Sequence, residues 1–420
     1  MSLSTPLSAF GALPKCLVAA ALLAVAACAT PAPPRDPGPV YVPPQPPPVE
    51  VEDPEPVDPT PQPPRFTGLI PPHMEGRELV RAAILLPFSA ENSGARAEAI
   101  QLLNAAQLAL FEHGTGDIVL MPKDTGGTAS GARQATQAAV RDGADIILGP
   151  LFGTAARAAG DEARSYDVPV IAFSTDGSVA GNGVYLLSFP PETEVARVIE
   201  YATRTGLSRF AYLGPTGAYG NIVRDAMDTE SRMGGGSLVA SEPYSGGVEA
   251  MTSAAARLAR SDTGYEAVML PEGGVRLRML GPLLPYHDVD PAEVRFLGTG
   301  LWNDPETIRE PVLRGGWFAG PDEAARSRFV ASYEAAYGEA PSRIASQAYD
   351  GVLLTLHLAG ARDGFTRAAV EDPEGFLGAD GLFRFRADGR IERGLAVYSV
   401  GRGGFTVIEP APRSFEPAGF

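Results

Sequence analysis

The fold is decided by residues 144–175, which read ADIILGPLFGTAARAAGDEARSYDVPVIAFST. Residues 144–150 have the composition of a short buried strand that ends in a Gly-Pro turn. Residues 154–166 favour a helix, and residues 168–175 form a second apolar run. A short apolar strand, a helix of this length and another apolar strand are typical of a βαβ unit, whose two strands are parallel. This stretch therefore predicts an α/β fold with a parallel sheet.

The same alternation continues on both sides of this stretch. Upstream, the pattern predicts a strand at 79–88, a helix at 96–111, a strand at 118–121 and a helix at 128–142 with Thr128 or Ser130 near its cap. Downstream, it predicts strands at 209–215, 265–271 and 294–300, and helices at 218–233, 249–261 and 273–284. Each of these strands ends near Gly or Pro, where a crossover loop turns. Two such series predict two lobes with a cleft between them, and ligands of parallel sheets bind outside the carboxyl ends of the strands.

An apolar run near the start of the chain ends in a cysteine: residues 17–30 read LVAAALLAVAACAT. The run is shorter than the 20 or so residues that cross a bilayer, but it fits the core of a signal peptide. Small residues before Cys28 resemble a bacterial lipobox. The resemblance implies that residues 1–27 are a signal peptide and that Cys28 carries a lipid that anchors the chain to a membrane. Ala29, where similar lipoproteins retained at the inner membrane have Asp, indicates a periplasm-facing lipoprotein of the outer membrane.

Composition sets three further bounds. Between residues 31 and 65, 16 of the 35 residues are proline, so this stretch has a reach on the order of 100 Å, and residues 28–77 are predicted to be a disordered linker. The cysteines are Cys16 and Cys28, so the mature chain has no disulfide and its fold rests on burial. The net charge of −16, without a basic tract, argues against a nucleic-acid partner.

Several segments resemble the type I periplasmic binding proteins, in the branch related to the Leu/Ile/Val-binding protein. They are IILGPLFGTAA (146–156), VPVIAFSTDGS (168–178), FAYLGPTGAYG (210–220), SQAYDGVLLTLHLA (346–359) and the closing run 381–408. The resemblance implies two Rossmann-like lobes with parallel sheets, joined by three crossovers. Carried over, lobe one comprises 78–188 plus 316–372, lobe two comprises 189–315 plus 373–410, and 411–420 form a tail.

In the amino-acid-binding relatives, small hydroxyl residues and backbone N–H groups at strand ends hold the ligand's carboxylate, a role that suits helix N-termini. The matching candidates for the ligand cleft are Ser89, Phe152, Gly153, Thr154, Ser174, Thr175, Asp176, Ser178, Tyr219 and Trp302. Helix capping and turn formation are the alternative roles for the hydroxyl and acidic residues among them.

Two departures from the relatives put a pocket for free amino acids in doubt. Asp176 stands where the relatives have a small neutral residue, and its charge would repel a ligand carboxylate. The relatives often place an acid after the strand matching 294–300 to neutralise the ligand amine, but here no acid occurs before Asp304. A buried ammonium without a counter-charge is costly. Trp302 is expected to fill the cleft or to stack on a different ligand.

Catalysis is not indicated. The sequence has no Gly-x-Ser-x-Gly, Walker A or His-Glu-x-x-His motif, and its four histidines are scattered, so no metal or cofactor is expected.

Two binding functions remain. The chain resembles, in context, the lipoproteins that activate class A penicillin-binding proteins, which are peptidoglycan synthases; the alternative is the solute-binding subunit of an ABC importer for branched-chain or other amino acids. The long spacer and the altered pocket favour the activator.

Overall fold

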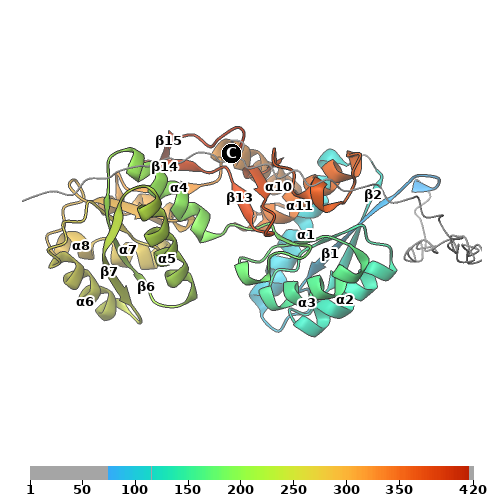
Figure 1. Ribbon diagram of the computed structural model, residues 1–420, viewed down its shortest axis with the longest axis horizontal. Coiled ribbons are helices and arrows are strands. Elements are labelled where there is room, and N and C mark those ends of the chain that lie inside the picture. Colours follow the sequence, from blue (N-terminus) through green and yellow to red (C-terminus); the bar gives the residue numbers. More distant parts are fainter. Residues whose placement is uncertain (1–73, 115, 416–420) are drawn as a thin grey trace, which may run out of the picture. The chain divides into compact units, whose positions relative to one another are not determined.

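The computed structural model describes residues 74–114 and 116–415 (Figure 1). The predicted signal peptide, Cys28 and the linker up to residue 73 lie outside the described residues. Residues Thr60–Phe420 form one compact unit, and the buried apolar residues of the core run from Ala82 to Val400 within it. This unit therefore contains its own cores and can fold by itself. Within the described part, every helix is too short or too polar to cross a bilayer.

Sheet A is the centre of lobe one. Its five strands are parallel, in the order β2-β1-β3-β4-β5: β1 (Val80–Leu86), β2 (Ile118–Asp124), β3 (Ile146–Leu148), β4 (Val170–Ala172) and β5 (Val184–Leu186). Alternate side chains of β1 enter different cores. Ile84 and Leu86 pack with α1 (Ser93–His113) and α11 (Ala345–Gly360), whereas Leu85 packs with α2 (Ala129–Arg141) and α3 (Gly153–Ala163). Helices thus cover both faces of the sheet (Figure 1), which explains why the strands β3, β4 and β5 are apolar and buried along their whole length.

Sheet B is the centre of lobe two, with the order β15-β14-β10-β9-β8-β6-β7. Its strands are β6 (Arg209–Pro215), β7 (Ser237–Tyr244), β8 (Ala267–Met269), β9 (Arg295–Gly298), β10 (Trp317–Gly320), β14 (Ala396–Val400) and β15 (Phe405–Glu409). Strands β14 and β15 run antiparallel to their neighbours, and the others are parallel. One face is covered by α4 (Pro191–Arg204) and α5 (Ala218–Met233), and the other by α6 (Val248–Ala259), α7 (Gly274–Leu280) and α8 (Leu283–Tyr286). The short helix α9 (Pro305–Arg309) follows β9.

Sheet C belongs to lobe one. It is an antiparallel sheet of β11 (Phe376–Gly378), β12 (Gly381–Phe385) and β13 (Ile391–Arg393). Phe376, Phe383 and Ile391 share a core with α1, α11 and α10 (Glu323–Tyr337), and the short α12 (Arg367–Val370) adds Val370 to it. The chain passes between the lobes three times: at 187–190, at 321–322 and at 394–395.

These crossovers differ from the sequence-based lobe boundaries at two places. Residues 316–320, expected in lobe one, contain β10, which pairs with β9 and β14 of sheet B. Residues 376–393, expected in lobe two, form sheet C, whose aromatic side chains pack in lobe one. The physical reason is the same in both cases: backbone pairing and burial, not position along the chain, assign these segments to a lobe. The fold class itself agrees with the sequence analysis.

Candidate functional site

The carboxyl ends of the strands in lobe one carry most of the predicted cleft residues. Ser89 follows β1 and is exposed, and its backbone N–H donates to Asp124 Oδ1 at 3.2 Å. Phe152 and Thr154, at the start of α3, are also exposed. Ser174 is buried, and its Oγ accepts a hydrogen bond from the backbone N–H of Asp176 at 3.1 Å. Most of these side chains therefore lie at one edge of the sheet, as the parallel topology requires.

Asp176 occupies the place that suits a ligand carboxylate. It begins the short 3-10 turn Gly177–Val179, and its Oδ1 accepts from Ser178 N at 3.0 Å and Ser178 Oγ at 2.7 Å. These hydrogen bonds lower the pKa of Asp176. A Cβ at Gly153 would lie 2.6 Å from Asp176 Oδ2, so the carboxylate lies against the first residue of α3. The N-terminus of this helix, which favours an anion, already has one from the chain itself.

In lobe two, the structure separates two predicted residues. Tyr219, at the start of α5, forms a 2.7 Å hydrogen bond between its hydroxyl and that of Thr299, directly after β9. Trp302 is completely buried in the core of lobe two, and its Nε1 donates to the carbonyl of Leu270 at 3.0 Å. The expectation that Trp302 fills the cleft or stacks on a ligand is wrong. Its ring lies where a Cβ of Gly298 would be, 2.2 Å from Cδ2, so the glycine makes room for it in the core.

A buried acid that sequence reasoning missed lies beside β9. Glu194, in the first turn of α4, accepts from the backbone N–H of Gly300 at 2.8 Å and from Arg343 Nη2 at 2.8 Å. A Cβ at Gly300 would lie 2.3 Å from Glu194 Oε1. Burial raises the pKa of Glu194, and Arg343 and Gly300 oppose this rise. An acid thus lies beside the end of β9, where the sequence has none before Asp304, but it comes from another element and has an arginine partner.

A second acid at the carboxyl edge of sheet B is paired in the same way. Glu272 follows β8 and is buried. It accepts from the Tyr244 hydroxyl at 2.7 Å, and Arg276 Nε and Nη2 donate to it at 2.9–3.0 Å. Burial and the neighbouring carboxylate raise the pKa of Tyr244. Neither of these two buried acids at the strand ends of lobe two is left to neutralise a ligand amine.

A cavity of about 300 Å³ lies where β9 ends and the first two crossovers pass. Its lining comes from both lobes and comprises Phe189, Gly300, Leu301, Asn303, Asp304, Pro321, Arg326 and Arg343. We call this the crossover pocket. Its volume is at the lower end of the range for small-molecule sites. The Arg343 guanidinium also lies 5.9 Å from the centre of the Phe189 ring.

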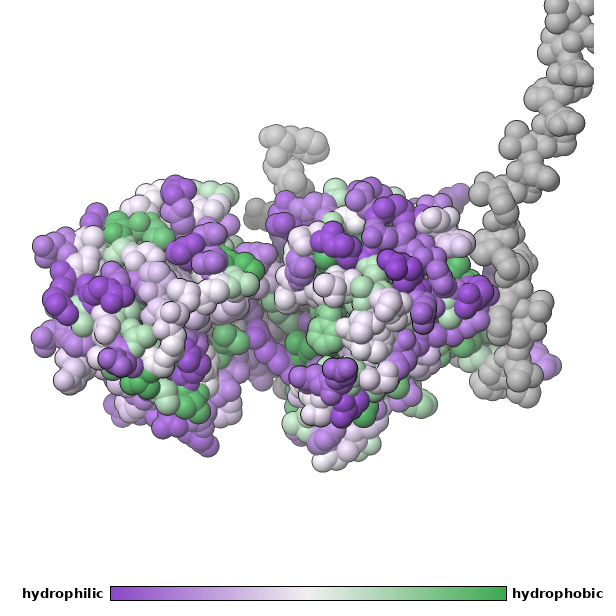
Figure 2. Space-filling model, turned by 90° about the horizontal axis from the view of Figure 1, so that it is seen from below, coloured by the Kyte–Doolittle hydropathy of each residue, from purple (hydrophilic) through white to green (hydrophobic). Residues whose placement is uncertain are grey.

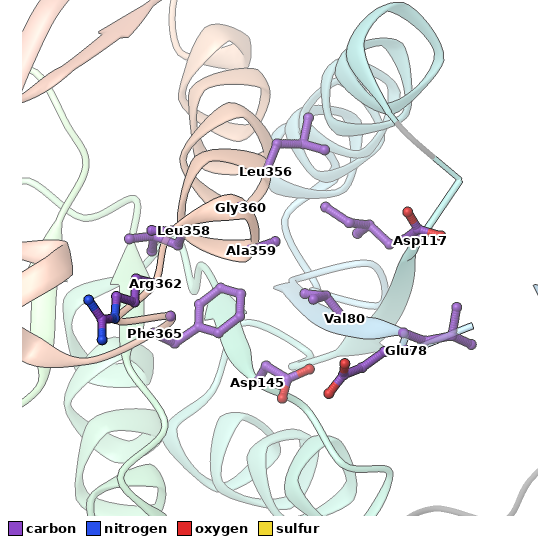
Figure 3. A pocket seen from close by; sticks show the side chains of 14 residues that line it. Glu78, Val80, Asp117, Asp145, Leu356, Leu358, Ala359, Gly360, Arg362 and Phe365 are labelled. Carbon is purple, nitrogen blue, oxygen red and sulfur yellow. The ribbon is translucent and has the colours of Figure 1, made fainter. Parts of the chain in front are cut away.

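A larger cavity, of about 690 Å³, lies at the opposite end of lobe one (Figure 3). Val80 and Glu78 at the start of β1, Asp117 before β2 and Asp145 before β3 line it, together with Phe365 from the loop after α11. It therefore lies at the amino ends of the strands, where parallel sheets do not bind their ligands. Burial raises the pKa of Asp145, whose Oδ2 accepts from the backbone N–H of Arg81. We assign this cavity no role in ligand binding.

The described residues hold no cluster of His, Cys, Asp and Glu that fits a metal ion. His113 Nε2 forms a hydrogen bond of 2.8 Å with the Tyr349 hydroxyl, and the ring of His357 packs edge-on against the ring of Phe376. On the face shown in Figure 2, hydrophilic residues predominate and hydrophobic ones form small separate groups. A partner that binds this face would therefore meet a mostly polar surface.

Comparison with known proteins adds to this geometry. A family model described as periplasmic binding protein matches residues 80–404. Among solved structures, a candidate branched-chain amino acid ABC transporter from Rhodospirillum rubrum has 20% identity and a TM-score of 0.68, and the match covers 79% of this chain and 100% of that one. None of the curated proteins matches this chain.

Two further structures illustrate the range of ligands. A leucine-, isoleucine-, valine-, threonine- and alanine-binding protein from Brucella ovis has 16% identity and a TM-score of 0.61, covering 81% of this chain and 97% of that one. A solute-binding protein of an ABC transporter from Rhodopseudomonas palustris, solved with 3,4-dihydroxybenzoic acid, has 20% identity and a TM-score of 0.57, covering 81% and 98%. At these identities the likeness establishes the fold.

Proposed function

We propose that this chain, which belongs to the periplasmic binding protein family, activates a peptidoglycan synthase. In this proposal it is a non-enzymatic lipoprotein of the cell envelope. The partner is a class A penicillin-binding protein, bound by the two-lobed domain, and lipid on Cys28 holds the chain at the outer membrane. One observation supports the proposal: the chain's own charges lie at the two positions where the carboxylate and the amine of an amino-acid ligand are expected. Asp176 lies at the N-terminus of α3, and Arg343 neutralises Glu194 beside Gly300.

The energetic consequence opposes binding of a free amino acid. A ligand carboxylate about 4 Å from Asp176 would be repelled by roughly 1 kcal/mol in water and about 4 kcal/mol at an effective dielectric constant of 20. A ligand ammonium that approached Glu194 would have to displace Arg343 or share the carboxylate with it. Because an incompletely paired charge is costly once it is buried, the pocket disfavours a zwitterion.

The linker supports a partner at a distance. An activator anchored at the outer membrane has to reach a synthase through the cell wall, and a proline-rich spacer with a reach on the order of 100 Å suits this task. We expect that shortening residues 31–65 abolishes activation in cells while the domain unfolds at the same temperature. Full activity with a spacer half as long would contradict the argument from reach.

The second candidate function is the solute-binding subunit of an ABC importer. The crossover pocket favours it, because a cavity of about 300 Å³ whose walls combine apolar residues with two arginines, Asn303 and Asp304 could hold a small polar solute. Among the structural neighbours, one is named for amino acids and another contains 3,4-dihydroxybenzoic acid.

Thermal unfolding of residues 60–420 with a panel of amino acids and aromatic acids separates the two functions. A ligand at 100 times its Kd stabilises by about 2.7 kcal/mol, which raises Tm by several degrees. We expect no shift with free amino acids, and we expect that the domain binds a purified class A synthase and increases its polymerisation rate. A shift of several degrees with a small acid, together with no effect on the synthase, would establish solute binding instead.

A further inference from the structure

Four charged side chains, three of them buried and one partly buried, lie together beside the crossovers of lobe one. They are Asp350 on α11, Asp380 between β11 and β12, Arg326 on α10 and Arg393 at the end of β13. Arg326 Nη1 donates to Asp380 Oδ1 at 2.7 Å, and Ala379 N donates to Asp350 Oδ1 at 2.6 Å. Both aspartates have almost no exposed surface. We call these four residues the crossover cluster.

The pairing inside the crossover cluster is incomplete. Asp350 Oδ2, Asp380 Oδ2 and both Nη atoms of Arg393 are buried without a hydrogen-bond partner. Arg393 Nη1 and Asp350 Oδ2 are 3.9 Å apart, which is within the range of an ion pair but too far for a hydrogen bond. Unmade bonds of this kind are rare in protein interiors and are commonly linked to function. Here one small movement of Arg393 would complete the contact with Asp350.

Arg393 has a competing contact with the crossover pocket. Its Nε donates to the Ser188 carbonyl at 2.7 Å, and its guanidinium lies over the Phe189 ring, 4.1 Å from the ring centre. Ser188 and Phe189 form the first crossover, and Arg393 directly precedes the third. Phe189 lines the crossover pocket. The position of Arg393 is therefore linked to the wall of that pocket.

We propose that Asp350 is a proton-linked switch: when its carboxyl is protonated, Arg393 stays over Phe189, and when it is ionised, Arg393 moves to Asp350 and releases the ring. The crossover pocket, and with it the surface offered to a partner, then responds to the pH of the cell envelope. This consequence for the partner rests on the proposed function. The switch itself rests on the contacts of Asp350, Arg393 and Phe189.

The charges around Asp350 set the pH at which the switch acts. Burial, followed by the neighbouring Asp380, raises the pKa of Asp350 to about 7, while Arg393 and Arg326 oppose this rise. On the other side of Arg393 stands Glu194 of α4, which is paired with Arg343. Near neutral pH, both forms of Asp350 are therefore populated. Below that pH the neutral form of Asp350 predominates.

The test follows the Phe189 ring by NMR in residues 60–420 with labelled phenylalanine, from pH 5.5 to 8.5. Phe189→Leu identifies the signal. We expect its chemical shift to titrate with a midpoint near 7, and Asp350→Asn, which resembles the protonated carboxyl, to hold it at the low-pH position. Asp145→Asn is the matched control, since Asp145 is a half-buried acid with a raised pKa far from the cluster, and it should leave the titration unchanged.

A second variant keeps the test decisive if Asp350→Asn does not fold. Asp380→Asn removes the like charge beside Asp350, so the midpoint should move to lower pH. A Phe189 signal that does not titrate, or an unchanged midpoint in Asp380→Asn, would overturn the proposal. The affinity for the synthase, measured at pH 6 and pH 8, separates the two proposals. Absence of binding at both pH values refutes the proposed function, whereas the switch is tested by the Phe189 titration alone.

Discussion

Replacing Gly300 with alanine tests whether the buried pair of Glu194 and Arg343 closes the amine side of the cleft. The new Cβ would lie 2.3 Å from Glu194 Oε1 and 2.7 Å from Arg343 Nη2, closer than real contacts allow. The carboxylate has to move, and it then loses the 2.8 Å hydrogen bond from the Gly300 N–H. A hydrogen bond to a charged group contributes about 1.5–3 kcal/mol, and breaking a buried ion pair costs about 3–5 kcal/mol.

The second figure has to be reduced, because the Arg343 side chain is 45% exposed and water partly screens it. We therefore expect Gly300→Ala to lower the free energy of unfolding by about 2–4 kcal/mol. Urea unfolding of residues 60–420 measures this value. Gly360→Ala is the matched control, since a Cβ at this position would have no atom within 4 Å and alanine in a helix is favoured by about 0.5–1 kcal/mol. A loss below about 0.5 kcal/mol in Gly300→Ala, with an unchanged m-value, would refute the reasoning.

Three further predictions concern the same region. Trp302→Ala should lower the free energy of unfolding by about 3–5 kcal/mol, because Trp302 is a buried core side chain. An unchanged free energy in urea unfolding would contradict this placement and would indicate that Trp302 faces the cleft. Asp176→Ser removes the carboxylate from the N-terminus of α3, so isoleucine should raise Tm in this variant more than in the unmodified domain; equal shifts would contradict that role. Because the pKa of Asp350 is raised in the folded state, its contribution to stability decreases as pH rises from about 4 to about 7 and is constant above that. The free energy of unfolding of Asp350→Asn, measured against pH, should lack this decrease. Parallel pH profiles for the variant and the unmodified domain would exclude a raised pKa of Asp350.

The apolar strands were the part of the fold that the sequence predicted well. Strands β3 and β4 and residues 82–86 of β1 are buried on both faces, so each appears as an uninterrupted apolar run. Strand β7 was missed because it is the edge strand of sheet B and its sequence, SLVASEPY, is half polar. Strand β5 (Val184–Leu186) was missed as well.

The site was less predictable, because its decisive contacts join distant segments. Nothing near Glu194 in the sequence indicates that its carboxylate reaches Gly300, 106 positions along the chain. The one signal in the sequence was the absence of an acid between the strand at 294–300 and Asp304. Trp302 was misplaced because the space for its ring comes from Gly298 and from Gly316, which is on another segment. Such complementarity between remote glycines and a large side chain is a property of the packed core and is not visible in local patterns.

The interleaved path of the chain has a consequence for secretion. Sheet A is complete once residue 186 has emerged, yet one of its faces is covered by α10 and α11, which lie beyond residue 322. During export, the side chains of Ile84, Leu86 and Leu148 on that face have only α1 to cover them until the last quarter of the chain has been translocated. Periplasmic chaperones would have to shield this face in the meantime, because exposed apolar surface promotes aggregation. Release of a product truncated at residue 320 would leave two unfinished cores rather than one folded lobe.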